Sequence, residues 1–349
     1  MAEVTLADLV TFQAEQCGRA GSPLYARILA DVHHDVVAGG VVAEVLAGHE
    51  HDPFGSALVL RLMGAVHRIV LEGRAPELAA CYPSAGGDAA APDVGAIFLA
   101  TVRAHQPEVV RRLHDGVQTN EVGRSGILVS GYARVAERTG LPLRVLEMGT
   151  SAGLNLRWDG FAYDTPAGVC GDPASPVRFG DLWEGASGPP LPSRIPVAER
   201  RGCDPSPIDP LSEDGRLRLR AFVWPDQVER RARLDAAFAV AEQLPAEVEQ
   251  ADGPTWVEAR LAEPAAGVAT VVVHSIVLQY LPRERRPEVG RILAAAGARA
   301  TADSPVAWLR MEPGGEVAEL RLTMWPDGRE ELLATSGFHG PPARWLAHD

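Results

Sequence analysis

The first 140 residues repeat apolar side chains at the three- and four-residue spacing of amphipathic helices. "TLADLVTFQAEQCGRA" offers Thr5 as a helix cap, and "SPLYARILADVHHDVV" opens with Ser22 followed by Pro23. Serine is favoured just before a helix and proline at its first position, so a second helix begins here. The same spacing predicts further helices over 56–72, 94–114 and 121–139.

The pattern changes at Arg144, where short apolar runs replace the long amphipathic ones. "RVLEMG" is an apolar run that ends in glycine, which is typical of a buried parallel strand. Later strand-like runs are "IPVAERRGCD", "AEVEQAD", "VATVVVHSIVLQYL" and "VAWLRME", with helical patterns between them. "RLRLR" (216–220) also alternates, and we interpret it as a strand with one solvated or ion-paired face of arginines.

Strands that alternate with helices predict an α/β fold with a mostly parallel sheet. Two last strand-like runs meet at Asp327-Gly328, a good hairpin turn, so an antiparallel C-terminal hairpin should extend the sheet. We expect an all-helical N-terminal cap domain over 1–118 and the sheet domain over 119–349. Residues 157–194 are rich in glycine, proline and aromatics and form an insert in the second domain.

Composition and charge exclude several classes of function. The chain has 33 basic and 46 acidic residues, a net charge of −13, which disfavours nucleic-acid and anionic membrane partners. All the basic residues are arginine, so lysine-based pyridoxal phosphate or Schiff-base catalysis is excluded. Four scattered cysteines, without a metal-binding spacing, and no signal peptide point to the cytoplasm.

The stretch "VLEMGTSAGLNL" (145–156) fits two chemistries. As G-x-S-x-G it is a nucleophile elbow, in which Ser151 attacks carbonyl groups with a downstream Asp and His. His339 and Asp303 could serve as those partners, but the helical residues before Ser151 supply no strands to carry an elbow. As E-x-G-x-S-x-G after a strand, it is a cofactor loop.

The cofactor interpretation uses Gly149, Ser151 and Gly153 as a loop that lets a ligand approach the backbone. Leu154 replaces the third glycine of a dinucleotide fingerprint, so NAD is disfavoured. S-adenosylmethionine requires less, namely acids at successive strand ends. The expected acids are Glu147, Asp204 for the ribose hydroxyls and Asp252 for the adenine, and each has an alternative as a simple turn or cap residue.

Four stretches together resemble a known family, the actinobacterial domain of unknown function 2332. They are "NEVGRSGILVSGYARVAERTGLPLRVLEMGTSAGLNL", "DPSPIDP", "AFVWPDQVERRARL" and "HSIVLQYLP". This resemblance covers nearly the whole chain but implies no reaction. At fold level the second half also resembles class I S-adenosylmethionine-dependent methyltransferases, which implies a Rossmann-like, methyltransferase-type sheet. The chain departs from that pattern at Ser151, where a glycine is usual, and in the long insert before Asp204.

Other residues at the predicted edge of the sheet are candidates for chemistry. His274 near the end of the fourth strand is a possible general base, and Tyr280, Gln279 and Ser275 would orient it or the substrate. The alternative for His274 is a buried histidine with satisfied hydrogen bonds. Trp158, Tyr163 and Trp224 would line a pocket or pack the insert against the sheet.

The helix before the first strand offers further contacts. Asn120 and Glu121 would face the substrate, and Arg124 would pair with the cofactor carboxylate. Alternatively, Asn120 caps the helix and Glu121 pairs with Arg124. Asn155 follows the loop closely enough to contact the cofactor. The leading hypothesis is an S-adenosylmethionine-binding methyltransferase for small molecules, and the alternatives are a non-catalytic binding protein and a serine hydrolase.

Overall fold

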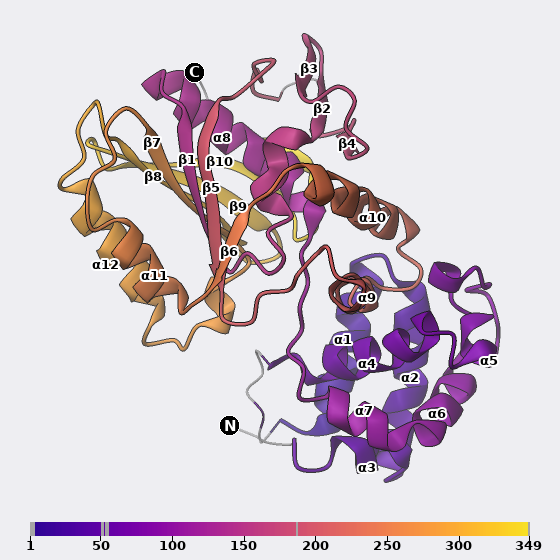
Figure 1. The fold of residues 1–349 in the computed structure, drawn as a ribbon. Coiled ribbons are helices and arrows are strands. Elements are labelled where there is room, and N and C mark those ends of the chain that lie inside the picture. Colours follow the sequence, from indigo (N-terminus) through magenta and orange to yellow (C-terminus); the bar gives the residue numbers. More distant parts are fainter. Residues whose placement is uncertain (1–3, 50–51, 53–55, 186–187, 348–349) are drawn as a thin grey trace. The chain divides into compact units, whose positions relative to one another are not determined.

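The computed structural model describes residues 4–49, 52, 56–185 and 188–347. The chain forms two compact units, and each is built from two stretches. Unit 1 comprises residues 1–119 and 213–232, and unit 2 comprises residues 120–212 and 233–349. Residues 213–232 follow a strand of unit 2 in the chain but pack with the N-terminal helices (Figure 1).

The helices of unit 1 at 6–19, 23–37, 58–71 and 94–112 are those that the apolar spacing predicts. The Thr5 hydroxyl accepts a hydrogen bond from Asp8 N (3.2 Å), and the Ser22 hydroxyl accepts one from Tyr25 N (3.3 Å), so both predicted caps are confirmed. The predicted helix over 94–114 is divided in two at His105, just before Pro107. The helices are α1 (Leu6–Arg19), α2 (Pro23–Val37), α3 (Val41–Leu46), α4 (Leu58–Leu71), α5 (Pro76–Ala79), η2 (Pro83–Ala85), α6 (Val94–Ala104), α7 (Gln106–Arg112) and α9 (Glu213–Ala221).

The predicted strand at "RLRLR" is wrong, because these residues belong to helix α9. Leu219 and Ala221 of α9 are buried, and α9 packs against α4. The His67 Nδ1 atom of α4 lies 3.0 Å from the carbonyl oxygen of Ala221. A five-residue alternation fits either element, and here burial against α4 favours the helix.

Unit 2 contains an eight-stranded sheet in the order β11-β10-β9-β8-β7-β1-β5-β6. The five strands from β6 to β8 are parallel to one another, and β9, β10 and β11 continue as an antiparallel meander. The α/β class, the mostly parallel pairing and the C-terminal hairpin at Asp327-Gly328 are therefore confirmed. The strands are β1 (Leu143–Met148), β5 (Val197–Asp204), β6 (Glu247–Gln250), β7 (Ala269–Ser275), β8 (Val306–Pro313), β9 (Ala318–Trp325), β10 (Arg329–Gly337) and β11 (Gly340–Trp345).

Helices cover both faces of this sheet (Figure 1). One face carries α8, which contacts strands β7 to β11, and the other carries α11 and α12. Leu146 and Met148 of β1 pack in one core cluster with Trp256 and Val257 of α11. Side chains alternate along a strand, so Glu147 lies on the opposite, α8 face. The helices are η3 (Val122–Arg124), α8 (Ser125–Thr139), η4 (Asn155–Gly160), α10 (Val228–Gln243), α11 (Gly253–Arg260), η5 (Leu278–Tyr280) and α12 (Arg286–Gly297).

The predicted insert contains a small sheet of its own, in the order β3-β2-β4. Tyr163 of β2 stacks on Phe179 of β4 with ring centroids 5.2 Å apart. The Tyr163 hydroxyl donates to the carbonyl oxygen of Trp158, 2.9 Å away, so these aromatics pack the insert internally. The strands are β2 (Ala162–Thr165), β3 (Gly168–Gly171) and β4 (Arg178–Phe179).

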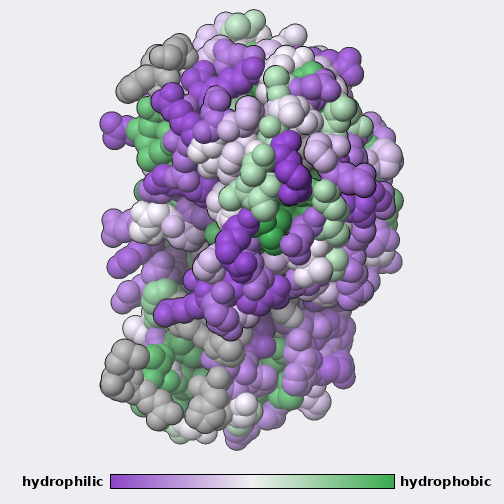
Figure 2. Space-filling model, turned by 90° about the vertical axis from the view of Figure 1, so that its left-hand side faces the viewer, coloured by the Kyte–Doolittle hydropathy of each residue, from purple (hydrophilic) through white to green (hydrophobic). Residues whose placement is uncertain are grey.

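Among the residues that the structure describes, no helix is both long and apolar enough to cross a membrane. On the face of the molecule drawn in Figure 2, hydrophilic side chains predominate and apolar ones are scattered among them. Exposed apolar residues are normal on a protein surface.

Candidate functional site

The order of the strands reverses at β1. The next sheet strands in the chain, β5 and β6, lie on one side of β1, and the following ones, β7 and β8, lie on the other. In open α/β sheets such a switch point leaves a crevice at the carboxyl ends of the strands, where ligands bind. The loop after β1 and the turn after β7 (residues 275–281) lie at this point.

The loop after β1 (149–154, the glycine loop) is held in a strained conformation. Gly149 and Gly153 have φ angles of 71° and 68°, and Ser151 has 55°, a value that costs a non-glycine residue free energy. A Cβ atom at Gly149 would lie 2.6 Å from Cγ2 of Val277 in the β7 turn. Gly149 is therefore required both by its backbone angle and by the valine packed against it.

Most amide groups of the glycine loop bind inside unit 2. The amides of Gly149 and Thr150 donate to the Cys203 carbonyl at 2.8 and 3.1 Å. The Ser151 amide donates to Oδ2 of Asp204 at 2.9 Å, and the Leu154 amide donates to Oδ1 of Asn120 at 2.9 Å. A phosphate-binding loop keeps such amides free for its ligand, so this loop is better suited to a ligand without phosphate.

Glu147 and Asp204 converge beneath the loop. Glu147 is only 3% exposed, and burial raises its pKa to about 7, although hydrogen bonding by Thr150 and the charge of Arg124 act in the opposite direction. The Asp204 carboxylate caps the loop through Ser151 and accepts a second bond from Ser206 N at 2.8 Å. The structure thus brings together two of the three expected acids.

The segment before α8 is joined to the loop by buried polar side chains. Asn120 binds the loop at Leu154 N, as described above. In addition, the side-chain nitrogen Nδ2 of Asn155 donates to the Glu121 carbonyl at 3.2 Å, and the Ser125 hydroxyl donates to Asn155 Oδ1 at 2.7 Å. Asn120, Glu121 and Asn155 are all buried. All three lie beside the loop, and their hydrogen bonds hold its backbone in place; the contacts with substrate and cofactor expected from the sequence stay predictions.

Arg124 bridges two turns at the carboxyl edge. Its Nη1 atom donates to the Ser275 carbonyl at 2.8 Å, and its Nε atom donates to the Phe338 carbonyl at 3.1 Å. Ser275 ends β7, and Phe338 lies in the turn between β10 and β11. The sequence predicts that the Arg124 guanidinium pairs with a cofactor carboxylate, but these two hydrogen bonds already use part of it.

Asp252 does not join the other two acids. It caps α11 by accepting a hydrogen bond from Thr255 N (3.3 Å), and it pairs with Arg285 Nη1 at 2.8 Å. The hydrogen bonds from Arg285 hold the pKa of Asp252 well below its usual range, and its side chain is 42% exposed. This arrangement fits its alternative role as a cap residue.

His274 lies on the other face of the sheet from Glu147. Val273 pairs with Glu147, so its neighbour His274 points to the α12 side. The Trp308 indole donates to His274 Nε2 at 2.9 Å, so Nδ1 carries the ring proton and donates to Glu312 Oε1 at 2.7 Å. Both ring nitrogens of this fully buried histidine are engaged, which favours the structural interpretation over a general base.

The remaining candidates are dispersed. Tyr280 on η5 has an exposed fraction of 56%, and the Gln279 carbonyl accepts a bond from Arg286 Nη2 at 3.0 Å. Trp158 is buried and stacks on Tyr132 of α8 with ring centroids 4.3 Å apart. Trp224 belongs to unit 1, where its ring centroid lies 6.2 Å from that of Tyr25.

Two residues around the switch point were not among the candidates. Arg157 is buried and donates to the Gly153 carbonyl at 2.7 Å and to the Leu244 carbonyl at 2.6 Å, so it holds the glycine loop from below. Glu312 lies near the end of β8, beside the β7 turn. The end of "VAWLRME" shows the same signal as the other acids, a carboxylate at the end of a strand, and could have revealed Glu312.

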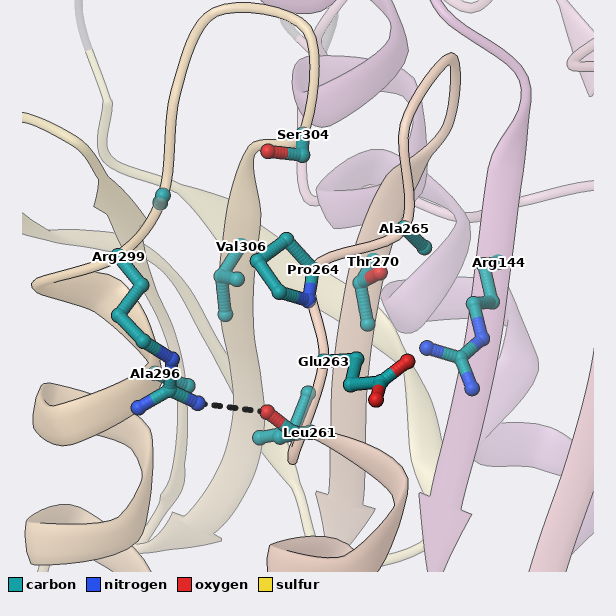
Figure 3. Close-up of a pocket in the computed structure, with 11 residues that line it drawn as sticks. Arg144, Leu261, Glu263, Pro264, Ala265, Thr270, Ala296, Arg299, Ser304 and Val306 are labelled. Atoms are coloured by element: carbon teal, nitrogen blue, oxygen red, sulfur yellow. Dashed lines mark hydrogen bonds between the residues drawn. The ribbon is translucent and has the colours of Figure 1, made fainter.

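A small pocket lies at the opposite, amino edge of the sheet (Figure 3). Arg144 of β1 and Thr270 of β7 line it, together with Arg299 after α12. Arg299 donates to the Leu261 carbonyl at 2.7 Å, and Arg144 donates to Glu199 at 2.8 Å. These partners satisfy the arginines, and the pocket is far from the switch point along the strands, so we assign no ligand to it.

No group of three or more metal-binding side chains occurs within the described part of the chain. Comparison with curated proteins and with solved structures gave no match. The model of one protein family, DUF2332, described as "Uncharacterized protein conserved in bacteria", matches residues 7–345. Because this match spans nearly the entire sequence, the chain belongs to the DUF2332 family.

Proposed function

We propose that unit 2 binds S-adenosylmethionine between the glycine loop and the β7 turn and transfers its methyl group to a small molecule. The observation that carries this proposal is the coincidence of two strained residues at the switch point. Ser151 after β1 and Ile276 after β7 have φ angles of 55° and 56°. Strain of this kind persists where the surrounding structure enforces it, and it is concentrated at ligand sites.

The chemistry of the loop agrees with this ligand. S-adenosylmethionine has no phosphate group, and the loop amides of Gly149, Thr150 and Ser151 are already bound. Its sulfonium and amino groups are cationic, and Glu147 and Asp204 lie below the same loop. Asp252 is not required in this version of the hypothesis.

When bound, S-adenosylmethionine would supply an electrophilic methyl group. The chain's contribution would be to orient the substrate for in-line attack, an effect that depends on position more than on acid-base chemistry. Tyr280 is the candidate for contact with the substrate, since its side chain is exposed on η5, within the β7 turn. We do not propose His274 as a general base.

Isothermal titration calorimetry with S-adenosylmethionine and S-adenosylhomocysteine tests binding. Saturable heat with either ligand supports the proposal, and a methyl-transfer assay with a panel of small nucleophiles then separates an enzyme from a non-catalytic binding protein. If neither ligand binds the folded chain, both the methyltransferase and the non-catalytic binding protein are refuted.

A serine hydrolase is the second candidate, because a positive φ at Ser151 after a central strand is also typical of a nucleophile elbow. Of the two partners expected from the sequence, Asp303 is poorly placed, because it precedes β8 and therefore lies at the amino edge, opposite Ser151. His339 lies in the turn between β10 and β11, at the carboxyl edge. Labelling by a fluorophosphonate probe that Ser151→Ala abolishes would establish this activity.

A further inference from the structure

Glu312 makes several hydrogen bonds to the β7 turn at the switch point. Its Oε1 atom accepts from His274 Nδ1 at 2.7 Å, from Val277 N at 2.9 Å and from Leu278 N at 3.4 Å. Two of these three donors are backbone amides of the turn itself. One carboxylate oxygen of β8 therefore holds the turn that follows the neighbouring strand.

The turn needs this support because Ile276 is strained. Its φ angle of 56° is a real outlier for a β-branched residue and is energetically unfavourable. The Ile276 amide donates to the Met311 carbonyl of β8 at 2.8 Å. Bonds to Met311 and Glu312 thus fix the backbone at Ile276 and at the two residues after it.

Val277 connects this turn to the glycine loop. Both of its methyl groups lie where a side chain on Gly149 would begin, 2.6 and 2.8 Å from the position of a Cβ atom. If the turn relaxed, Val277 would move away from Gly149, and the loop would lose the side chain that packs on it. The position of Val277 therefore determines the shape of one wall of the proposed site.

His274 orients the Glu312 carboxylate. Because Trp308 donates to its Nε2 atom, the histidine presents Nδ1–H to Glu312 in a fixed tautomer. Burial acts to raise the pKa of Glu312, but the hydrogen bonds from His274 and from the Val277 and Leu278 amides outweigh it, so the pKa is lowered and the group is ionised near neutral pH. An ionised carboxylate is the stronger acceptor for the two turn amides.

We propose that Glu312 is a positioning residue of the switch-point site, which acts through Val277 on the glycine loop. For ligand affinity this inference rests on the proposed binding of S-adenosylmethionine. For the backbone it stands independently, since it predicts coupling between two segments that are separate in the sequence. It also gives His274 a role as the residue that orients Glu312.

The test compares Glu312→Ala with Glu312→Gln in the full chain. The alanine variant loses the acceptor, so hydrogen exchange should accelerate about tenfold or more at residues 276–281 and also at 149–154. The dissociation constant for S-adenosylmethionine should rise about tenfold, equivalent to 1.4 kcal/mol. Glutamine keeps one acceptor oxygen and should restore both properties to within about threefold of the wild type.

Glu319→Ala is the matched control, because Glu319 pairs with Glu312 across β8 and β9 but binds Arg321. It should leave exchange at both segments unchanged. Val277→Ala supplies a second variant that keeps the Glu312 bonds and removes only the contact with Gly149. It should accelerate exchange at 149–154 and weaken ligand binding, with little change at the β7 turn.

Unchanged exchange at 149–154 in both Glu312→Ala and Val277→Ala would overturn the inference, as would a glutamine variant as impaired as alanine. The second result would mean that the charge itself, or Oε2, contacts the ligand. If the wild type binds no S-adenosylmethionine, the proposed function fails, and the exchange measurements alone decide the coupling.

Discussion

Ser151, Ile276 and Gly149 show how single residues shape the site. The first two hold positive φ angles without being glycine, and Gly149 has φ 71° with Val277 packed against it. The conformations of Ser151 and Ile276 are unfavourable by themselves, so they must be maintained by the hydrogen bonds that Ser151 N donates to Asp204 and Val277 N donates to Glu312. Single substitutions at these positions therefore test most directly what holds the glycine loop in its conformation.

Gly149→Ala should destabilise the protein by about 2–4 kcal/mol, because it adds a strained φ angle and a methyl group against Val277. Gly140→Ala is its control. Gly140 has a similar φ of 66°, but no atom lies within 4 Å of the place that a Cβ atom would take, so only the backbone cost of about 1–2 kcal/mol should remain. Urea unfolding of both variants measures the difference, and equal losses would contradict the packing role of Val277.

Glu147→Gln should change the pH dependence of stability. Folding raises the pKa of Glu147 from 4.5 to about 7, so between these values the folded chain retains a proton that the unfolded chain has lost. Stability of the wild type therefore falls as pH rises through this range, by roughly 3 kcal/mol relative to the variant. Glu137→Gln, on an exposed part of α8, is the control for urea unfolding at pH 5 and pH 8.

A difference in the free energy of unfolding between Glu147→Gln and the wild type that stays constant from pH 5 to pH 8 would mean that Glu147 ionises normally in the folded chain.

At the residue scale the sequence indicated Glu147 and Asp204 correctly as strand-end acids, although their ligand roles stay predictions. It did not indicate that Asp204 accepts a hydrogen bond from the Ser151 amide of the glycine loop, because that depends on the pairing of β1 with β5.

The elements of unit 2 explain why some strand-end acids converge and others do not. Glu147 and Asp204 meet at the ends of β1 and β5, which are neighbours. Asp252 begins α11 and pairs with Arg285, which precedes α12. The hydrophobic pattern predicted the strands well, since their apolar runs are short and buried. It could not predict the face on which His274 lies, because that requires the register between strands.

Asp204→Asn and Asp252→Asn should therefore differ. Asparagine at 204 places an amide donor against Ser151 N or Ser206 N, so we expect a loss of about 1–3 kcal/mol and at least tenfold weaker binding of S-adenosylmethionine. Asparagine at 252 remains a good helix cap, so stability should fall by about 1 kcal/mol or less and affinity should not change. Calorimetry and urea unfolding of the two variants give both quantities.

Equal weakening of ligand binding by Asp204→Asn and Asp252→Asn would contradict this distinction and restore a ligand role for Asp252.

Helix α9 is the element for which the prediction from the hydrophobic pattern is most clearly wrong. Its alternating arginines and leucines predict a strand as well as a helix, and only its packing against α4 decides between them.

At the scale of the whole molecule, unit 1 is completed by a segment from the middle of the chain. Asp226 accepts a hydrogen bond from the Ser22 hydroxyl at 2.6 Å, and Phe222 lies against Gly64 of α4. Residues 213–232 thus carry side chains that are suited to the helical unit. The hydrophobic pattern does not indicate that residues 213–232 pack with the N-terminal helices, because this packing arises from contacts between residues that are distant in the sequence.

A fragment of residues 120–349 should consequently be poorly soluble, because α9 would expose Leu219 and Ala221 without α4. Replacing 213–232 in that fragment with a glycine-serine linker of the same length should increase its soluble yield severalfold. Size-exclusion chromatography of the two fragments measures this effect. Equal solubility would contradict the dependence of α9 on the N-terminal helices of unit 1.

Calorimetric titration of the full chain with S-adenosylmethionine is the most direct test of the central claim. We predict saturable binding at one site per chain, weakened at least tenfold by Gly149→Ala and unaffected by Gly140→Ala. A folded wild-type protein that binds neither S-adenosylmethionine nor S-adenosylhomocysteine, or equal affinity in both glycine variants, would contradict a ligand site at the β1 and β7 switch point.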